Sequence, residues 1–341
     1  TLLSVKNNGI LMASMLVQAE VMQTSVSIFD IIGGRNSDPM LWTDDIQAFR
    51  DHTGSKGLAY GTAYFPFVET TIIQTSDLDY TNLFGGDLKQ LQPLLSPADH
   101  PNVTIETILG NIQNPIGMPL TVRQYNNSLL TASKTYSNII NHVLQDANIL
   151  PPSGGMAGVI TVTDNEVGPW QAPANTSMVG VASLPIKLSE TQQGGLNVDA
   201  VSGKSINAIR FFNGLVILIW GARTLDGNSQ DWRYLSVRRT MNFLEQSSKL
   251  AAQAYVFAPN DKNTWEAVKT MIGSFLTSIW KEGGLQGATA ASAFSVQCGL
   301  GVTMTSDDIL NGFMNVTIKV AVVRPAEFIV LTFQQQQATS S

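Results

Sequence analysis

The sequence predicts an α/β fold for the first part of the chain and a smaller α+β unit after it. Helical patterns alternate with short apolar strands in the first part, and this alternation is typical of α/β proteins. A chain of 341 residues is long enough for two domains that each bury a core. Turn-rich stretches before residue 200 place the expected boundary between residues 1–203 and 204–341.

The first half supplies most of the expected α/β alternation. A helix is expected over residues 10–22, followed by a buried strand that ends at Gly33 and Gly34. A second helix is expected over residues 43–53, because Gly54 can stop it. The segment 57–73 predicts two strands separated by Pro66.

Three further segments complete the first half. Recurrent proline and glycine residues predict a loop-rich insertion over about 81–120. Apolar residues at helical spacing predict one helix over 128–148. The segment 150–164 then predicts a stiff Pro-Pro entry, a glycine-rich turn and a strand.

The second half predicts strands and two long helices. A buried strand or strand pair is expected over 208–222, a helix over 236–253 and, within 254–261, a strand ended by Pro259. The next helix, 264–281, is expected to start at a capping box of Asn263 and Glu266, with Gly283 past its end. Its apolar stripe comprises Trp265, Val268, Ile272, Phe275, Leu276 and Ile279. The last strands are expected over 292–298, 314–324 and 327–337.

The composition favours a protein whose faces meet other protein. Charged residues make up 13% of the chain, about half the usual share. An ordinary enzyme is the alternative that composition leaves open. Cys298 is the single cysteine, so the chain has no disulfide framework, which fits assembly in a reducing cytoplasm. The longest apolar run, 214–222, is far short of the roughly twenty residues of a membrane span, so no direct membrane insertion is expected.

The residues that metal and nucleotide sites need are missing. His52, His100 and His142 stand far apart without companion ligands, so no metal is expected. Residues 202–205, SGKS, end like a phosphate-binding loop, but Val198 stands where that motif needs glycine. The sequence therefore predicts no cofactor.

Ser177 supports one catalytic alternative. It lies in NTSMV, a context similar to that of subtilisin-type nucleophiles, and Asp30 follows an apolar strand. A serine nucleophile needs a histidine base held by a carboxylate, but His52 and His142 lack the glycine-rich histidine motif of those proteases. The competing interpretation is a turn in which Ser177 satisfies backbone groups.

Arginines are concentrated in one stretch of the second half. Five of the nine fall within thirty residues: Arg210, Arg223, Arg233, Arg238 and Arg239. The net charge of −6 and the acidic residues nearby argue against nucleic acid. Bidentate pairs with carboxylates are the expected role, and those carboxylates lie either in the same chain or in a neighbouring copy.

A series of motifs over residues 135–337 resembles the tail sheath proteins of contractile phages and of phage-tail-like contractile injection systems. In chain order they are LPPSGGMAGVITVTD, GPWQAPAN, IWGARTL, DWRYLSVRRTMNFLEQS, VFAPNDKNTWEAV, FLTSIWKEGGLQG and RPAEFIVLTFQQ. The segments SIFDIIGG and YGTAYFPFVE resemble strands of that family's subtilisin-like α/β domain, which lacks catalytic residues. The resemblance implies that residues 1–203 form this domain without its N-terminal portion, and that 204–341 form the C-terminal sheath domain.

The resemblance implies a structural protein and no enzyme. Sheath subunits form hexameric rings that stack helically around an inner tube protein. Contraction from a metastable extended state then drives the tube through a target envelope. Baseplate and terminator or cap proteins would be further partners, and the particle would be a phage tail or an injection system. A subtilisin-fold serine hydrolase and a non-contractile shell protein are the alternatives.

The resemblance also suggests two sets of contact residues. The C-terminal arm, 327–341, is expected to add a strand to a neighbouring subunit. The candidates for contacts between subunits are Arg223, Arg238, Arg239, Glu327 as their partner, Phe328, Val330 and Phe333. The candidates for contact with the inner tube are Lys262, Lys269, Lys281 and Glu282. Ion pairs internal to the chain, and a helix with a merely solvated face, are the respective alternatives.

Overall fold

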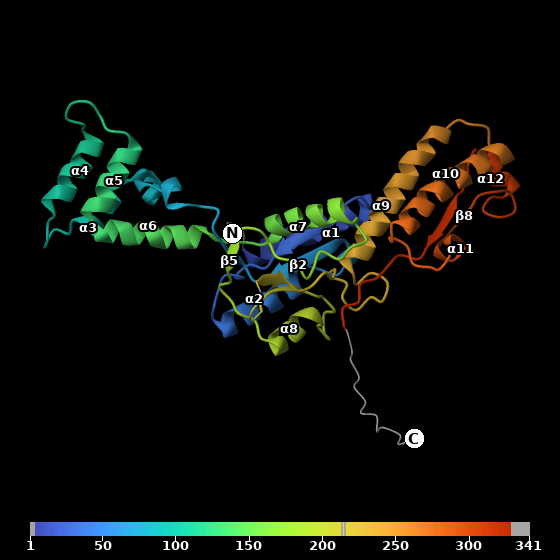
Figure 1. Ribbon diagram of the computed structural model, residues 1–341, viewed down its shortest axis with the longest axis horizontal. Helices are drawn as coiled ribbons and strands as arrows, with labels where there is room; N and C mark the ends of the chain where they lie inside the picture. Colours follow the sequence, from blue (N-terminus) through green and yellow to red (C-terminus); the bar gives the residue numbers. More distant parts are fainter. Residues whose placement is uncertain (1–3, 213, 215, 329–341) are drawn as a thin grey trace, which may run out of the picture.

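A mixed α/β body forms the centre of the molecule in a computed structural model that describes residues 4–212, 214 and 216–328 (Figure 1). Its four-stranded sheet has the order β1 (Ser27–Asp30), β2 (Gly61–Phe65), β6 (Asn207–Phe211) and β7 (Ile217–Ile219). The first three strands are parallel and β7 is antiparallel to β6. The alternation predicted from the sequence is confirmed as a mixed α/β architecture.

Helices cover both faces of this sheet. α2 (Pro39–His52) and α8 (Glu190–Asn197) pack on one face, and α7 (Ser153–Glu166) packs on the other (Figure 1). α1 (Val5–Met22) contacts both β1 and α2. Because β2 is covered on both faces, all five of its residues are buried, whereas buried and partly buried residues alternate in β1.

The sheet continues past residue 203, the expected boundary. β6 pairs with β2, so residues on both sides of that boundary share one sheet. Residues 202–205 lie just before β6, and Lys204 donates a hydrogen bond to the carbonyl of Arg50 near the end of α2. This lysine binds a helix C-terminus, where a cation is favoured.

A helical module separates two strands of a second sheet. β3 (Val68–Thr70) pairs with β4 (Ile149–Leu150) and β5 (Val181–Ser183) in the order β4-β3-β5. Between β3 and β4 the chain forms α3 (Leu88–Leu95), α4 (Val103–Gln113), α5 (Val122–Ala132) and α6 (Lys134–Ala147). The module lies at one end of the molecule and has its own core, which includes Leu91, Ile105, Leu129, Tyr136 and Ile140 (Figure 1).

Two predictions for this region were wrong. Residues 81–120 are not loop-rich, because α3 and α4 bury Leu91, Ile105 and Leu109 against the helices that follow. The single helix expected over 128–148 is two helices, broken at Ser133. The Ser133 hydroxyl accepts a hydrogen bond from the Tyr136 N–H at 3.1 Å and so caps α6.

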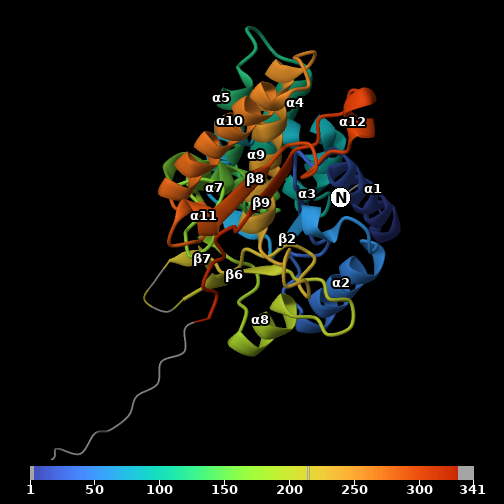
Figure 2. The same ribbon diagram turned by 90° about the vertical axis from the view of Figure 1, so that its right-hand side faces the viewer.

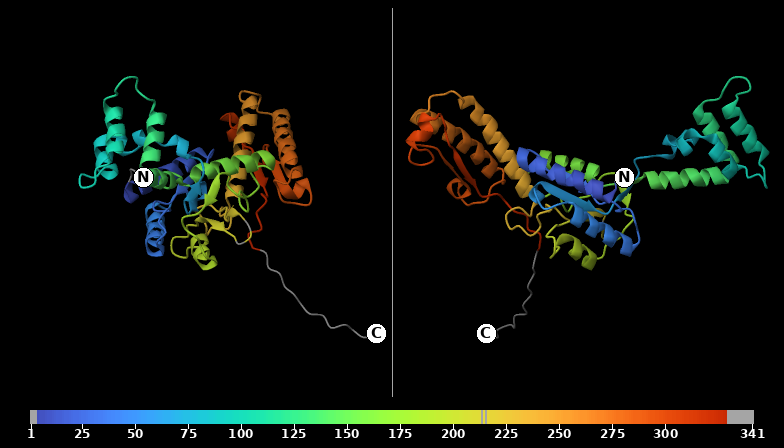
Figure 3. Two further views of the ribbon diagram at one scale, coloured as in Figure 1. Left: turned by 60° about the vertical axis from the view of Figure 1, so that its left-hand side comes forward. Right: turned by 180° about the vertical axis from the view of Figure 1, so that it is seen from behind.

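The C-terminal unit lies at the other end of the molecule. It contains α9 (Leu235–Ala252), α10 (Lys262–Lys281), α11 (Ala290–Ala293) and α12 (Ser306–Leu310). β8 (Phe294–Gln297) and β9 (Thr317–Val320) form an antiparallel pair in front of α10 (Figure 2). α9 runs from the body into this unit (Figure 3). Short 3₁₀ turns occur at Leu58–Tyr60, Thr75–Asp77, Tyr80–Asn82, Phe84–Gly86 and Gln253–Tyr255.

The prediction of a strand within 254–261 was also wrong. This segment follows the chain from the Gln253–Tyr255 turn into a loop. α10 starts earlier than predicted. Asp261 is its N-cap and accepts a hydrogen bond from the Thr264 N–H at 3.0 Å, in place of the predicted box of Asn263 and Glu266. Gly283 follows the helix with a φ of 89°, as predicted for a glycine past its end.

The strand predicted within 150–164 is the helix α7. Its first turn is stabilised by Asp30, which lies at the end of β1 and far away in the sequence. The Asp30 carboxylate accepts hydrogen bonds from the Ser153 N–H at 2.9 Å and from the Ser153 hydroxyl. This tertiary contact supplies a helix cap that the local sequence lacks.

Loss of this cap should destabilise the body. We expect Asp30→Ala to lower the free energy of unfolding by about 1–2 kcal/mol, the usual effect of removing a helix cap. Asp30→Asn should lower it less, because the amide oxygen still accepts from the Ser153 N–H. Urea unfolding followed by circular dichroism measures both.

The same pair of variants tests a pH effect. Burial raises the pKa of Asp30 above its usual value, and the two hydrogen bonds from Ser153 oppose this only in part. The folded protein therefore binds the Asp30 proton more tightly than the unfolded chain, so this group's contribution to stability falls as the pH rises above 3.8 through the raised pKa. Asp30→Asn should lack that slope, and an unchanged slope would contradict the assignment.

Candidate functional site

Glu327, near the end of the described chain, is held by three side chains of the body. Arg223 forms a bidentate pair with it, with Nε 2.9 Å from Oε1 and Nη2 2.6 Å from Oε2. The Tyr234 hydroxyl donates to Oε2 at 3.3 Å, and Asn197 Nδ2 donates to Oε1 at 3.0 Å. The structure thus brings together Arg223 and Glu327, the pair that the sequence analysis suggested, within one chain.

Arg223 is itself held firmly where the chain leaves β7. Its N–H donates to Asn207 Oδ1 at 2.7 Å, and its carbonyl accepts from Thr62 Oγ1 at 2.8 Å. The Arg223 side chain is 4% exposed and that of Glu327 is 20% exposed. Removing either partner would leave a largely buried charge without compensation, which is costly.

A groove of about 640 Å³ lies beside this ion pair. Trp170, Trp220 and Phe328 contribute aromatic side chains to it, and Gln171 and Asn175 contribute amides. Phe328 is 72% exposed and is the last residue that the structure describes. Burial, and next to it the negative charge of Glu327, raise the pKa of Tyr234 at the base of the groove. Val330 and Phe333 lie outside the described residues.

Arg239 links two helices of different parts of the molecule. It lies on α9 and forms a bidentate pair with Asp164 on α7, with Nη1 2.8 Å from Oδ1. The pair borders a cleft of about 880 Å³ that is also lined by Trp170 and Glu282. Arg239 therefore helps to fix α9 on the body.

Arg238 has a different environment from its neighbour. Its side chain is 4% exposed and lies between the rings of Tyr60 and Trp232, whose centroids are 4.5 Å and 4.3 Å away. Its Nε donates to Asn242 Oδ1 at 2.8 Å, and its Nη2 lies 3.4 Å from Glu245 Oε1. These contacts are internal to the chain. The planar guanidinium stacks on two aromatic rings, which a lysine ammonium group would do less well.

The remaining arginines of the cluster make separate contacts. Arg233 Nε donates to the Ser229 carbonyl at 2.9 Å. Arg210 lies over the Phe212 ring at 5.0 Å and donates to Gln193. The five arginines therefore serve several local contacts and do not line a common anion site.

The expected inner-tube candidates lie on or next to α10. Lys262, Lys281 and Glu282 are exposed, and Lys269 is partly buried and pairs with Glu266 at 2.7 Å. The opposite side of α10 buries Val268, Ile272, Leu276 and Ile279, members of the predicted stripe. The charged residues are thus available on the outer side of the helix.

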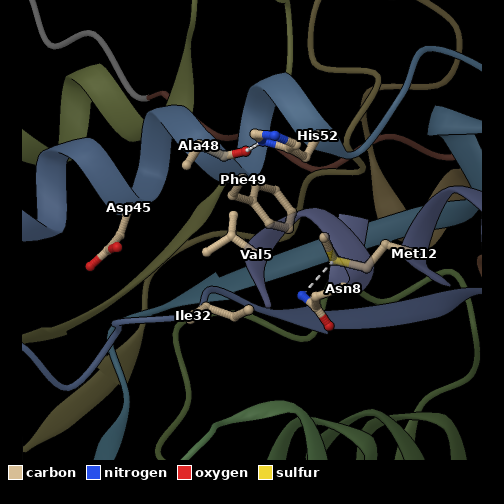
Figure 4. Close-up of a pocket in the computed structure, with 8 residues that line it drawn as sticks. All are labelled: Val5, Asn8, Met12, Ile32, Asp45, Ala48, Phe49 and His52. Atoms are coloured by element: carbon tan, nitrogen blue, oxygen red, sulfur yellow. Dashed lines mark hydrogen bonds between the residues drawn. The ribbon is translucent and has the colours of Figure 1, made fainter. Parts of the chain in front are cut away.

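The catalytic alternative finds no supporting geometry among the described residues. Asp30 is hydrogen-bonded to Ser153, and His52 Nδ1 lies 2.8 Å from the Ala48 carbonyl, where it faces α1 (Figure 4). His142 lies on α6 in the helical module. No hydrogen bond joins Ser177 to a histidine in the part of the chain that the structure describes.

Within residues 4–212, 214 and 216–328 no group of three or more histidine, cysteine, aspartate or glutamate side chains is placed to hold a metal ion. No helix of this described part combines the length and the apolar character needed to cross a membrane.

Sequence reasoning missed several residues that hold the site together. Asp164, Tyr234 and Asn197 contact the predicted arginine and glutamate residues from distant segments. Asp164 and Asn197 lie at helix ends within turn-rich sequence, where polar residues are expected for local reasons. No rule of sequence spacing connects Asp164 with Arg239, or Asn197 with Glu327, because the members of each pair lie tens of positions apart.

Comparison with known proteins agrees with the motifs. The model of the phage tail sheath C-terminal domain matches residues 228–336. The tail sheath protein of Vibrio phage KVP40 is 29% identical over 139 residues, which is 40% of this chain and 20% of that protein.

Two solved structures match nearly the whole chain. A chain of the anti-feeding prophage baseplate is 27% identical with a TM-score of 0.64, over 98% of this chain and 66% of that chain. A chain of the extracellular contractile injection system PVC sheath complex, in the contracted state, is 28% identical with a TM-score of 0.61, over 91% of this chain and 63% of that chain. The 341 residues therefore span less than two thirds of the length of these relatives. Residues 228–336 therefore match the phage tail sheath C-terminal domain, and the chain as a whole is similar to a chain of a contractile injection system's sheath complex.

Proposed function

We propose that this chain is the structural subunit of a contractile sheath, which assembles with copies of itself into hexameric rings stacked helically around an inner tube. The similarity to the PVC sheath complex, which extends over 91% of the chain, carries the proposal. The low content of charged residues, 13%, fits a molecule largely covered by neighbours. Baseplate and cap proteins would contact the ends of the stack, and assembly would take place in the bacterial cytoplasm.

The work of such a subunit is mechanical. A contractile lattice has two packings, and each subunit contributes a difference in free energy between them. Rigid subunits transmit that difference to the lattice. The pairs Arg239–Asp164 and Arg223–Glu327 support rigidity, because they tie the body to α9 and to the chain that returns from the C-terminal unit.

Strand exchange is the proposed joint between copies. Among the described residues, β8 and β9 pair only with each other as named strands, so this pair can accept further strands at its outer edges. The arm 327–341 begins at the clamped Glu327 and at the exposed Phe328. The clamp sets the point from which the arm leaves for a neighbour.

We also propose that the body is a subtilisin-like domain without catalytic function. Its parallel strands and two helical layers support that topology, and Asp30 is engaged in capping α7. Since β6 and β7 belong to the sheet of this body, the C-terminal sheath unit is best taken to begin at α9. Lys262, Lys281 and Glu282 on the outer side of α10 are the proposed contacts to the inner tube.

Assembly should depend on the Glu327 clamp. Glu327→Ala leaves the Arg223 guanidinium buried without its carboxylate, a cost on the order of 3 kcal/mol. We expect a folded chain that forms few or no tubes in electron microscopy of the concentrated protein, whereas the parent forms tubes with six-fold symmetry.

Arg324→Ala is the matched control, because Arg324 lies on the same returning segment as Glu327. Its ion pair with Asp231 is exposed. Exposed pairs contribute about 1 kcal/mol or less, so this variant should assemble normally. Normal tubes from Glu327→Ala would refute the role of the clamp. A parent protein that never assembles, even with its tube protein, would refute the sheath proposal. Ser177→Ala, which removes the candidate nucleophile of the catalytic alternative, should leave assembly unchanged.

Charge reversal on α10 tests the contact with the tube. Lys262→Glu combined with Lys281→Glu should weaken co-sedimentation with preformed inner tubes, because both charges are exposed. Lys249→Glu, at an exposed position on α9, serves as the control. Equal binding by the double variant and the control would place the tube contact elsewhere.

A further inference from the structure

The end of the C-terminal unit that lies farthest from the body exposes a group of large apolar side chains. They come from the loop between α9 and α10, from the loop after β8, and from α12 with the turn that follows it (Figure 1). Each of them is more than half exposed: Val256, Phe257, Leu300, Val302, Leu310 and Phe313. We call these six residues the apolar tip.

Hydrogen bonds hold the three segments of the apolar tip side by side. Asn260 Nδ2 donates to the Phe313 carbonyl at 2.9 Å, and Asn260 Oδ1 accepts from Trp265 Nε1 at 2.7 Å. Thr303 Oγ1 donates to the Asn315 carbonyl at 2.6 Å. The segment after α12 is thereby tied both to the start of α10 and to the loop after β8. The apolar tip is therefore one surface, built from distant parts of the sequence.

The backbone at Phe257 is strained. Its φ of 67° lies in the left-handed region, which a bulky residue rarely adopts. The turn is held on both sides, because the Val256 N–H donates to the Gln253 carbonyl at 3.2 Å and the Ala258 N–H to the Tyr255 carbonyl at 3.0 Å. Residues in such conformations are concentrated at contact and switch sites. The turn thus holds a fully exposed aromatic side chain in one place, as an anchor residue at an interface is held.

The apolar tip carries no charge. Its three segments contain no aspartate, glutamate, lysine or arginine: 253–260, 298–305 and 309–316. Asp261, Lys262, Asp307 and Asp308 lie at the borders of these segments. Protein interfaces have the same plan, with an apolar centre that is depleted of charge and a polar rim. A stable interface takes about 800 Å² from each partner, and six large, exposed side chains supply much of such an area.

We propose that the apolar tip binds a second copy of this chain, on a surface of that copy other than its own tip. Contact between two identical tips would close a pair with two-fold symmetry, whereas contact between two different surfaces builds rings and helical stacks. The apolar tip is thus a joint of the lattice that is separate from strand exchange. This inference rests on the proposed sheath function.

A second copy suits the apolar tip better than the inner tube does. Every copy carries a net charge of −6, so copies repel one another least where their surfaces are uncharged. The proposed contacts with the tube are charged side chains of α10, and exposed charge pairs are weak enough to release a tube that moves. A joint between copies has to hold in both packings of the lattice, and burial of aromatic and aliphatic side chains supplies that strength.

Sedimentation velocity of the full 341-residue chain over a range of concentrations tests the proposal. Phe257→Asn combined with Phe313→Ser should weaken self-association at least tenfold relative to the parent, because two aromatic side chains leave the contact. Asparagine tolerates a positive φ, and both replaced side chains are exposed. Circular dichroism should therefore show this tip variant folded like the parent.

Ile116→Ser combined with Met118→Ser is the matched control. These side chains are 91% and 93% exposed on the loop between α4 and α5, at the other end of the molecule (Figure 1). The control loses a similar amount of apolar surface and should associate as the parent does. At a concentration at which the chain is monomeric, the tip variant and the parent should co-sediment equally with preformed inner tubes.

Photo-crosslinking identifies the occupant. Phe257→p-benzoylphenylalanine should give crosslinks between two copies of the chain in the assembled protein. Mass spectrometry should place the crosslinked residue of the second copy outside its apolar tip.

Several results would overturn the proposal. Equal self-association of the tip variant and the parent is one, and an equal loss in the tip variant and the control is another. Crosslinks found only to the tube protein, only within one chain, or only between two tips contradict it as well. A parent that forms no tubes, even with its tube protein, refutes the sheath proposal too. Tubes formed as readily by the tip variant as by the parent refute this inference alone.

Discussion

The pair between Arg223 and Glu327 is the constraint on which the arrangement of the C-terminal half depends. Arg223 lies where the chain leaves the central sheet, and Glu327 lies where the chain returns from the C-terminal unit. One bidentate contact, supported by Tyr234 and Asn197, therefore closes a path of about a hundred residues. Because the arginine is almost fully buried, the returning segment has one favourable position against the body.

A second ion pair and an aromatic residue complete the connection. Arg239 on α9 holds Asp164 on α7, so the helix that leads out of the body is fixed to a helix that covers its sheet. Trp170 lies near Gly284, where no larger side chain would fit beside its ring. The C-terminal unit is thus attached to the body by an outgoing helix and by a returning segment. Such a double attachment would suit the contractile sheath role proposed above.

Open edges and uncovered apolar surface recur in this molecule. Among the described residues, β8 and β9 form a sheet of two strands, and β1 is the end strand of the central sheet. α1, which contacts β1, exposes several apolar side chains. In an isolated monomer such features favour aggregation, whereas in an assembly the same backbone groups form the joints. The small number of charged residues, 13% of the chain, leaves little to repel an incoming strand.

The sequence by itself predicted the α/β class, the position of most helices, the resemblance to tail sheath proteins, and Glu327 as a candidate partner of Arg223, although it favoured a contact between subunits for that pair. These properties depend on local periodicity and on motifs that keep their order. Only the tertiary structure decided that 150–164 is a helix, since its cap comes from Asp30, and that 81–120 folds into helices with their own core. It also decided that Arg238 is internal, stacked between Tyr60 and Trp232. In each case the deciding contact comes from residues distant in the sequence, and no local spacing encodes the free energy of such a contact.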